Sequence, residues 1–422
     1  MKKTLCVALI CVIFILSVNI QSVFAFNNET IEFVFNNRIF EYCLETNIKK
    51  GALFDEDFKI NQYNRFSSYK ERKELLIKMN KLGFEKSVAL NYIFPNLNST
   101  VARLEKTINS NATNAELKTN SHSEKVFKVI PEKFGLKVDK QELFNRIFNK
   151  YVSNETLIVN VPTIKVNPTV FKSDFEKFIN LRADFSTDIS SSSTDRKHNI
   201  KNAMKALNFV EIFPNQVFSF NKIVGRRTEQ NGYRNAKIIV NNEFVDGVGG
   251  GVCQVSSTLY NAALLAGLEI LEANKHSKQV AYVKYGFDAM VNFGSSDLKI
   301  KNNTQQKIII ITNTSSSVAR IRLFGESLNG VNYKLKNEIF NVEEPAEEIM
   351  QDVEKKHTDK VVYNDEWFYL KKQSKGMEIK SFREKYVNGE LVSSELLRHD
   401  KFKVQNGVKV YGTEQRVYNL SN

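Results

Sequence analysis

Apolar residues recur at helical spacing directly after a glycine-rich segment in the middle of the chain. The segment runs over residues 247–251, and the apolar positions that follow lie three and four residues apart. Gly267 comes after the last of them as a stop signal. This periodicity predicts a helix that begins at Cys253. The residues on its apolar face are Val255, Leu259, Ala262, Ala263 and Ala266.

Similar patterns predict the other elements. Amphipathic spacing predicts helices over residues 71–81, 139–151 and 199–209. Short apolar runs between turn residues predict strands. These lie at 126–130, 157–161, 217–220, 280–285, 289–293, 298–301, 307–312 and 319–324, with a hairpin over 238–245 that Asn241 and Asn242 close and a strand-rich segment that ends at 408–413.

A cysteine-bearing helix followed by antiparallel strands is typical of an α+β fold. With 422 residues and 42% hydrophobic content, the chain is long enough for several domains with sizeable cores. We therefore expect a multi-domain α+β protein. Its central domain packs the Cys253 helix on an antiparallel sheet, between smaller α+β and β-rich regions. A polar junction is expected at 186–194. The expected divisions are an N-terminal signal or anchor segment at 1–25, a helical or mixed region at 26–105, a separate module at 106–184, the central domain at 185–326 and a β-rich region at 327–422.

The first residues have the character of a secretory signal peptide. Lys2 and Lys3 precede an apolar run, and Ala25 offers a small residue at a cleavage site. We expect cleavage, and the alternative is an uncleaved anchor over residues 5–26, which is nearly long enough to span a bilayer. The protein is thus expected outside the cell or in the cell wall, or anchored in the membrane and facing outward.

Charge and cysteine content narrow the environment. The formal net charge of +13 suits an anionic cell-wall polymer or membrane surface, although a lysine-rich solvated face explains it equally well. We expect no nucleic-acid partner, because aromatic residues do not interleave with a basic patch. Beyond the signal segment only Cys43 and Cys253 remain, too few for a disulfide scaffold. We expect a buried Cys43 and a free Cys253 thiol, and the alternative is a bridge between them.

Cys253 stands where a nucleophile is expected. A thiol at a helix N-terminus lies near the positive end of the helix dipole, which favours the thiolate. Gly249, Gly250 and Gly251 let a substrate approach the backbone and leave N–H groups for an oxyanion. The Gln254 side chain is a further candidate donor. In the alternative interpretation the glycines serve only tight helix–sheet packing.

A candidate base and two candidate acids follow the cysteine. His276 precedes a predicted strand, and Asp288 and Asp297 come after it. This is the order of papain-like enzymes, in which the base holds the thiol proton and the acid orients the imidazole. The sequence leaves the choice of acid open, and each residue also has a structural alternative, such as an aspartate that bonds its own turn. A metal site of Cys253, His276 and Asp288 lacks paired ligand spacing, so we expect no metal and no cofactor.

Residues 199–304 resemble the VanW domain family, which is named from glycopeptide-resistance clusters of Gram-positive bacteria. The resemblance rests on residues 218–221, on the run from Gly249 to Asn261, on His276-Ser277, on 286–289 and on 297–302. The preceding residues 111–161 resemble a peptidoglycan-binding module, through 127–135 and Val138-Asp139. Residues 375–413 are similar to a small β-rich domain of wall-adhesion proteins that is named for its glycines.

The resemblance implies an exported cell-envelope protein with peptidoglycan or another cell-wall polymer as its partner, and a membrane contact only through an uncleaved N-terminal segment. It specifies no reaction, so the chemistry is inferred from the residues. The first hypothesis is a cysteine amidase, peptidase or transpeptidase that acts on wall amide bonds. Its expected substrate contacts are Gly249, Gly250, Gly251, Ser256, Ser257 and Tyr260. The second is a non-catalytic wall-binding or scaffold protein.

Overall fold

The computed structural model describes residues 30–43, 68–94, 97–120, 123–240 and 243–416. They form two compact units. The first combines the described residues up to Glu116 with residues 130–171, and the second combines residues 117–129 with those from Lys172 onward. The expected signal peptide or anchor lies outside the described residues. Within them, no helix has the length and apolar character needed to cross a bilayer.

The first unit packs helices against a small sheet. Its elements are β1 (Thr30–Phe35), β2 (Arg38–Cys43), α2 (Tyr69–Lys81), α3 (Lys86–Ile93), α4 (Leu97–Ile108), β5 (Gly135–Val138), α5 (Lys140–Val152), β6 (Ile158–Asn160) and β7 (Thr163–Val166). Strand β1 is antiparallel to β2 and parallel to β6, and β5 pairs with β7. The predicted helices at 71–81 and 139–151 are confirmed as α2 and α5. Ser68 and Asp139 cap their N-termini, which fixes where the two helices begin.

One hydrophobic core holds this unit together. Its buried residues extend from Ile31 to Val161, so residues on both sides of position 105 contribute to it. Tyr151 of α5 is fully buried, and its ring meets that of Phe94 edge to face at 5.1 Å between centroids. Such aromatic pairs add stability beyond the area that they bury.

The second unit contains the Cys253 helix. Its elements are α6 (Lys172–Glu176), β8 (Asn180–Asp188), α7 (Thr194–Leu207), β9 (Val210–Ile212), β10 (Val217–Ser219), α8 (Phe220–Val224), η1 (Glu229–Asn231), β11 (Asn235–Val240), β12 (Glu243–Val248), α9 (Val252–Leu265), β13 (Glu269–Glu272), β14 (Lys299–Lys301), β15 (Ile308–Thr314), β16 (Val318–Gly325), β17 (Val331–Glu343), β18 (Glu347–Gln351), β19 (Trp367–Lys371), β20 (Gly376–Val387), β21 (Glu390–Phe402) and β22 (Gly407–Tyr411). The strands β3 (Glu116–Thr119) and β4 (Phe127–Ile130) pair with each other, and Phe127 packs on Phe324 of this unit.

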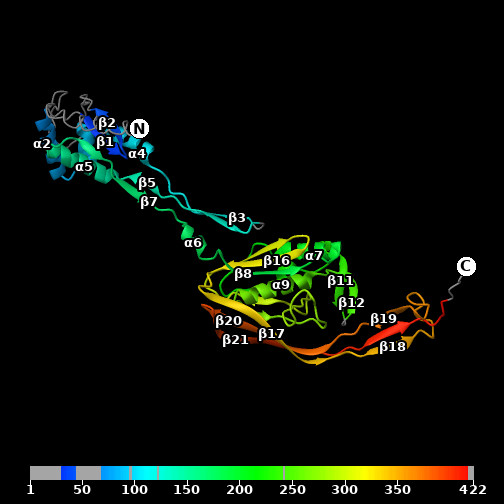
Figure 1. Ribbon diagram of the computed structural model, residues 1–422. Helices are drawn as coiled ribbons and strands as arrows, with labels where there is room; N and C mark the ends of the chain where they lie inside the picture. Colours follow the sequence, from blue (N-terminus) through cyan, green and yellow to red (C-terminus); the bar gives the residue numbers. More distant parts are fainter. Residues whose placement is uncertain (1–29, 44–67, 95–96, 121–122, 241–242, 417–422) are drawn as a thin grey trace, which may run out of the picture. The chain divides into compact units, whose positions relative to one another are not determined.

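Helix α9 lies at the centre of this unit (Figure 1). Nearly all of its side chains are buried, as expected of a helix that is apolar around most of its surface. It packs on the antiparallel sheet β8-β16-β15-β9 through β8 and β16, and it also contacts α7, β13 and β17. The expected multi-domain α+β fold, with a cysteine-bearing helix on an antiparallel sheet, is therefore confirmed.

The predicted strands at 298–301, 307–312 and 319–324 are confirmed as β14, β15 and β16, and the hairpin as β11 and β12, although its turn at 241–242 lies outside the described residues. The expected polar junction at 186–194 instead ends β8 and begins α7, which starts earlier than predicted because Ser193 caps it. Strands β8 and β13 were not predicted.

Two further predicted strands are wrong. Residues 280–285 and 289–293 form turns and isolated bridges, so no strand follows His276 directly. The backbone of this segment is hydrogen-bonded to side chains of α9, and not to a neighbouring strand. The Ser257 hydroxyl accepts from the Ala289 N–H at 2.9 Å, and the Asn261 amide donates to the Phe287 carbonyl at 2.7 Å. A short apolar run shows burial, but it does not show which partner satisfies the backbone.

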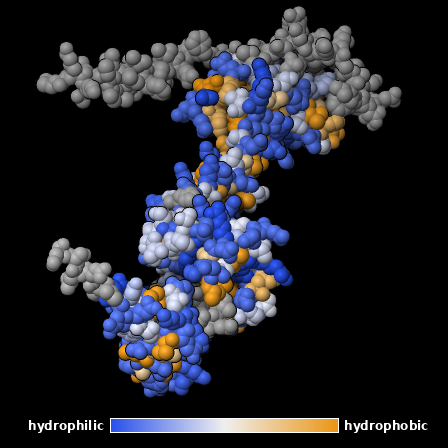
Figure 2. Space-filling view, turned by 90° about the vertical axis from the view of Figure 1, so that its right-hand side faces the viewer, coloured by the Kyte–Doolittle hydropathy of each residue, from blue (hydrophilic) through white to orange (hydrophobic). Residues whose placement is uncertain are grey.

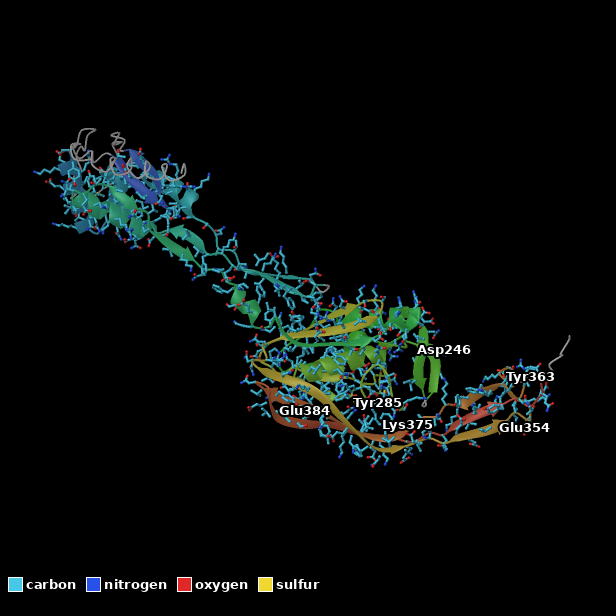
Figure 3. All side chains as sticks on the ribbon, viewed as in Figure 1. Asp246, Tyr285, Glu354, Tyr363, Lys375 and Glu384 are labelled. Carbon is cyan, nitrogen blue, oxygen red and sulfur yellow. The ribbon has the colours of Figure 1, made fainter. Side chains whose placement is uncertain are left out.

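The C-terminal region is β-rich, as predicted. The long strands β17, β20 and β21 form one antiparallel sheet, and β18, β22 and β19 form another. The first sheet contacts the end of α9, where Arg383 donates to the Leu268 carbonyl at 2.6 Å. Figure 3 places Glu384 on this sheet and Tyr285 beside it. The face in Figure 2 is mainly hydrophilic with scattered apolar side chains, in keeping with 60 lysines and arginines.

Candidate active site

Cys253 occupies the first turn of α9, at the wall of a cavity. The helix begins after Gly251, whose φ of 107° favours glycine. The cysteine is free and half-buried, and its Sγ lies 3.4 Å from the carbonyl oxygen of Val291. The cavity has a volume of about 780 Å³, a size typical of small-molecule sites. Cys253 is thus a free thiol at a helix start, as predicted.

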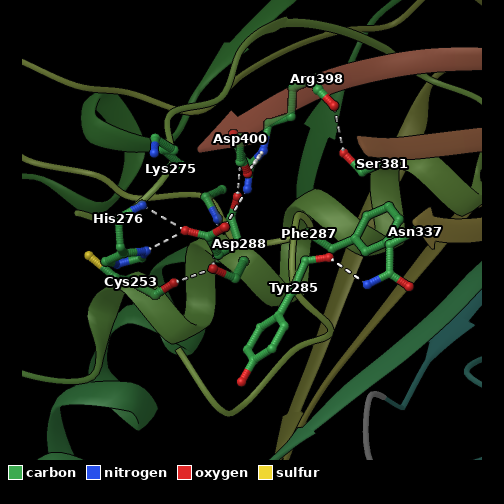
Figure 4. Close-up of polar contacts among 12 residues, drawn as sticks. Cys253, Lys275, His276, Tyr285, Phe287, Asp288, Asn337, Ser381, Arg398 and Asp400 are labelled. Atoms are coloured by element: carbon green, nitrogen blue, oxygen red, sulfur yellow. Dashed lines mark hydrogen bonds and ion pairs between the residues drawn. The ribbon is translucent and has the colours of Figure 1, made fainter. Parts of the chain in front are cut away.

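His276 and Asp288 lie beside this thiol (Figure 4). The backbone N–H and the Nδ1 atom of His276 both donate to Oδ2 of Asp288, at 2.7 and 2.6 Å. Because Nδ1 is engaged, Nε2 is the ring nitrogen left to interact with the Cys253 thiol, and this interaction raises the pKa of the imidazole. Both His276 and Asp288 are buried. His276 therefore stands between the thiol and the Asp288 carboxylate, to which it is hydrogen-bonded.

The electrostatics of this group favour a thiolate beside an imidazolium. Burial raises the pKa of the Cys253 thiol, but the hydrogen bond with His276 and the charges of His276 and Arg227 outweigh it, so the pKa lies below its usual value. Burial lowers the pKa of His276, and its bonds to Asp288 and Cys253 raise it to about 9. Burial also raises the pKa of Asp288, whereas His276 and Arg398 bring it below its usual value.

Arg398 of β21 holds the acid from the C-terminal region. Its Nη2 pairs with Oδ1 of Asp288, its Nη1 donates to the Asp288 carbonyl oxygen at 2.7 Å, and its Nε donates to Asp400 at 2.8 Å. Sequence reasoning missed this residue because it lies 110 positions after Asp288. The only signal in the sequence is the pair of opposite charges at Arg398 and Asp400, two residues apart and so on one face of a strand.

Asp297 has a different place. Its carboxylate accepts from the Ser219 hydroxyl at 2.5 Å and from the Asn221 N–H at 2.8 Å. These bonds hold the junction of β10 and α8. The structure therefore brings Asp288, and not Asp297, to His276.

Gln254 is buried and engaged in the fold. Its Nε2 donates to the Thr187 hydroxyl at 3.1 Å and to the Asp188 carbonyl at 2.8 Å, while its Oε1 accepts from Arg196 at 2.9 Å. Both amide hydrogens are thus used away from Cys253. Gln254 instead orients Arg196, which lines the cavity.

The remaining candidates divide into two groups. Gly249, Gly250 and Gly251 line the cavity, whereas none of the other three is among the described residues that do. Ser256 and Ser257 are buried and tether the 287–289 segment to α9. Tyr260 is also buried, which raises its pKa to about 12.

The glycine loop offers backbone donors next to the thiol. The N–H groups of Val252 and Gln254 donate to the carbonyls of Gly249 and Gly251, at 3.2 and 3.0 Å. No acceptor in the described part of the chain bonds the N–H of Gly251 or of Cys253. These two groups are the candidate oxyanion donors, since unpaired backbone N–H groups stabilise developing negative charge.

The cavity wall is basic, which the sequence did not reveal. Besides Cys253 and His276, its wall contains the basic side chains of Arg196, Arg226, Arg227 and Lys237, and no aspartate or glutamate is among the described residues that line it. Tyr282 also lines it, and burial together with the nearby Cys253 raises the pKa of its hydroxyl well above the usual value. The described residues contain no cluster of three histidine, cysteine or acidic side chains that could hold a metal ion.

Two ranges of the chain each match a known protein family. Residues 195–324 match the family described as "VanW like protein", and residues 58–158 match the family described as "Putative peptidoglycan binding domain". The chain therefore carries a VanW-like domain, which contains Cys253, His276 and Asp288, after a domain of the peptidoglycan-binding family. The two domains together indicate a cell-wall-associated protein.

Individual relatives agree with this class. The "Uncharacterized protein YoaR" of Bacillus subtilis (strain 168) is 38% identical over 184 residues, 43% of this chain and 60% of that protein. The "Vancomycin B-type resistance protein VanW" of Enterococcus faecalis (strain ATCC 700802 / V583) is 31% identical over 112 residues, 25% of this chain and 40% of that protein. The chain thus spans less than two thirds of the length of either relative.

Two solved structures are similar to shorter parts. "Crystal structure of HP0197-G5" is 18% identical and covers 19% of this chain and 97% of that chain, with a TM-score of 0.12. "IgA1 Protease G5 domain structure" is 18% identical and covers 21% of this chain and 99% of that chain, with a TM-score of 0.14.

Proposed function

We propose that this protein is a cysteine enzyme that attacks amide bonds of peptidoglycan. The observation that carries the proposal is the group of Cys253, His276 and Asp288 beside a cavity, in which His276 is hydrogen-bonded to Asp288 and the thiol pKa lies below its usual value. A neighbouring domain of the peptidoglycan-binding family supports the choice of substrate. Perturbed pKa values in a cavity are typical of catalytic groups.

The reaction follows from the positions of these groups. The Cys253 thiolate attacks the amide carbonyl carbon, and the electron pair of the C=O bond moves to oxygen, which the N–H groups of Gly251 and Cys253 stabilise. Collapse of this adduct breaks the C–N bond, and the amine takes the proton of imidazolium His276. The thioester that remains is attacked by water, or by a second amine in a transfer. His276 accepts the proton of the attacking group, and the Cys253 thiolate leaves, which restores the initial pair of thiolate and imidazolium.

The proposal includes export, because the enzyme and the wall must meet outside the membrane. The basic head and apolar run of residues 1–25 support it. N-terminal sequencing of protein recovered from the culture medium or the wall fraction tests it. We expect a mature chain that begins after Ala25, whereas an intact Met1 in a membrane fraction would show an anchor.

The test of catalysis uses the wild-type protein beside Cys253→Ala, each incubated with peptidoglycan and with soluble muropeptides. Mass spectrometry reads the products, and co-sedimentation with cell wall measures binding. We expect new products with the wild type only, and equal co-sedimentation of both proteins. The product masses distinguish hydrolysis from transfer. If neither protein forms products while both sediment with the wall, the non-catalytic hypothesis replaces the proposal.

A further inference from the structure

Two polar side chains of the cavity wall have buried nitrogen atoms that bond nothing in the described part of the chain. These atoms are Nη1 and Nη2 of Arg227 and Nε2 of Gln279. Both residues line the cavity that contains Cys253. A buried donor without an acceptor costs free energy, and folded proteins rarely keep one without a reason. Three such donor atoms on side chains that line one cavity indicate a place for an acceptor that arrives with a ligand.

The Arg227 side chain is held in position although its two terminal nitrogens bond no acceptor among the described residues. The Phe220 ring centroid lies 5.6 Å from its Cζ. Its stem packs on Gly249, where an added Cβ would come within 2.7 Å of the Arg227 Cβ. Several other partly buried arginines of this unit differ, because each donates to a backbone carbonyl. They are Arg182, Arg383 and Arg398.

The charge of the cavity selects the sign of the ligand. Arg227 lies close enough to Cys253 for each to influence the charge of the other. Its neighbours at the wall include Arg196, Arg226 and Lys237, with no acidic side chain among the described lining residues. An anion is therefore attracted to this cavity, and it gains most where the donors are unbonded and shielded from water.

We infer that Arg227 and Gln279 form a subsite for a carboxylate group of the ligand that enters the Cys253 cavity. A guanidinium presents two parallel N–H groups that match the two oxygens of a carboxylate, and the Gln279 amide adds a neutral donor. The inference rests on the proposed function in that it makes this ligand the substrate. The preferred substrate is then a peptide or amide with a free carboxylate near the bond that Cys253 attacks.

The test measures binding on full-length Cys253→Ala, so that no turnover interferes. Isothermal titration calorimetry compares N-acetyl-alanyl-alanine with its C-terminal amide, which differs only in lacking the carboxylate. We expect the acid to bind at least tenfold more tightly than the amide. Adding Arg227→Gln should abolish this preference, and Arg227→Lys should retain only part of it, because lysine keeps the charge without the two parallel donors. Thermal unfolding checks that each variant is folded.

The matched control is Lys222→Gln, an equal change of charge at an exposed residue of α8 that is not among the described residues lining the cavity. It should keep the preference for the acid. The inference is overturned if acid and amide bind alike, if Lys222→Gln loses as much as Arg227→Gln, or if inorganic phosphate displaces the acid and binds more tightly. Acid-selective binding without products from the wild type would remove the proposed function and leave the carboxylate site standing. Products without acid-selective binding would do the reverse.

Discussion

The Nη1 atom of Arg398 donates a 2.7 Å hydrogen bond to the backbone carbonyl of Asp288, and so joins strand β21 to the acid beside His276. The second terminal nitrogen of the same guanidinium pairs with the Asp288 carboxylate. Two contacts to one residue fix its backbone and its side chain together. The VanW-like match ends at residue 324, so a region beyond the matched domain completes the candidate site.

Arg398→Met should slow catalysis indirectly, because it removes the side chain that holds Asp288 in position. Asp288 and Asp400 would lose the guanidinium that they share, although Asp288 keeps His276, and breaking a buried ion pair destabilises a protein by about 3–5 kcal/mol. We expect product formation to fall on the order of tenfold or more, as for partners that orient catalytic groups. Arg398→Lys should retain more product formation than Arg398→Met. Chemical unfolding and the pH dependence of Cys253 alkylation are the measurements.

Arg383→Met is the matched control for this change. Arg383 lies in the same sheet with a side chain of equal exposure, 14%, but it bonds Leu268 and Glu395. It should cost stability and leave the alkylation profile of Cys253 unchanged. An unaltered profile in a folded Arg398→Met protein would contradict the positioning role.

Asp288→Asn and Asp297→Asn should separate the two acids that the sequence left open. Asparagine at 288 removes the charge that holds the imidazolium, so the pKa of His276 should fall and the pKa of the thiol should rise. We expect product formation to drop on the order of a hundredfold or more. Asp297→Asn should instead cost about 1–3 kcal/mol of unfolding free energy, because its bonds to Ser219 and Asn221 weaken. If product formation fell equally in Asp288→Asn and Asp297→Asn, both acids would act only by stabilising the fold.

Local sequence signals predicted several helices and strands, but not the contacts between them. The glycines before Cys253 and Gly267 after α9 act within a few residues of the helix ends, so they predict its bounds. In the four-stranded sheet, apolar runs predicted β15 and β16, whereas β8 and β9 were not predicted. The 280–293 segment has a similar apolar character but bonds to α9 side chains, which depends on residues more than 20 positions away.

The candidate site shows the same limit. Residue types and order predicted Cys253, His276 and a following acid, because those chemistries are rare in combination. They did not show that Gln254 turns into the fold, because its partners Thr187, Asp188 and Arg196 lie 58 or more positions away in the chain. Arg398 lies too far along the chain for any local pattern to relate it to Asp288.

The pH dependence should report the thiol and the imidazole separately. The pKa of Cys253 is lowered, so the rate of product formation should begin to rise below the free-cysteine value of about 8.5. Loss of the His276 proton removes the acid that serves the leaving amine, so this rate should fall as the pH passes about 9. Alkylation by iodoacetamide should show only the rising limb, because it needs the thiolate alone.

His276→Gln should shift the pH at which Cys253 alkylation rises to a higher value. Burial then acts on the thiol without the imidazolium, so its midpoint should exceed that of free cysteine. His198→Gln is the control, because this histidine bonds the Gly232 carbonyl at 2.9 Å and does not contact the thiol. An unchanged midpoint in His276→Gln would exclude the ion pair.

Gly251→Ala should distort the start of α9 more than a matched glycine change elsewhere. Gly251 has φ of 107°, and an added Cβ would lie 2.9 Å from Cγ1 of Ile200. Gly294 has φ of 94° with nothing within 4 Å of such a Cβ. Both substitutions carry the strain of a left-handed backbone, about 1–3 kcal/mol. Only Gly251→Ala adds overpacking, which costs a further amount of about 1–3 kcal/mol. Urea unfolding should show this difference, and Cys253 alkylation should slow in Gly251→Ala alone. Equal losses in the two variants would mean that the helix start tolerates the extra methyl group.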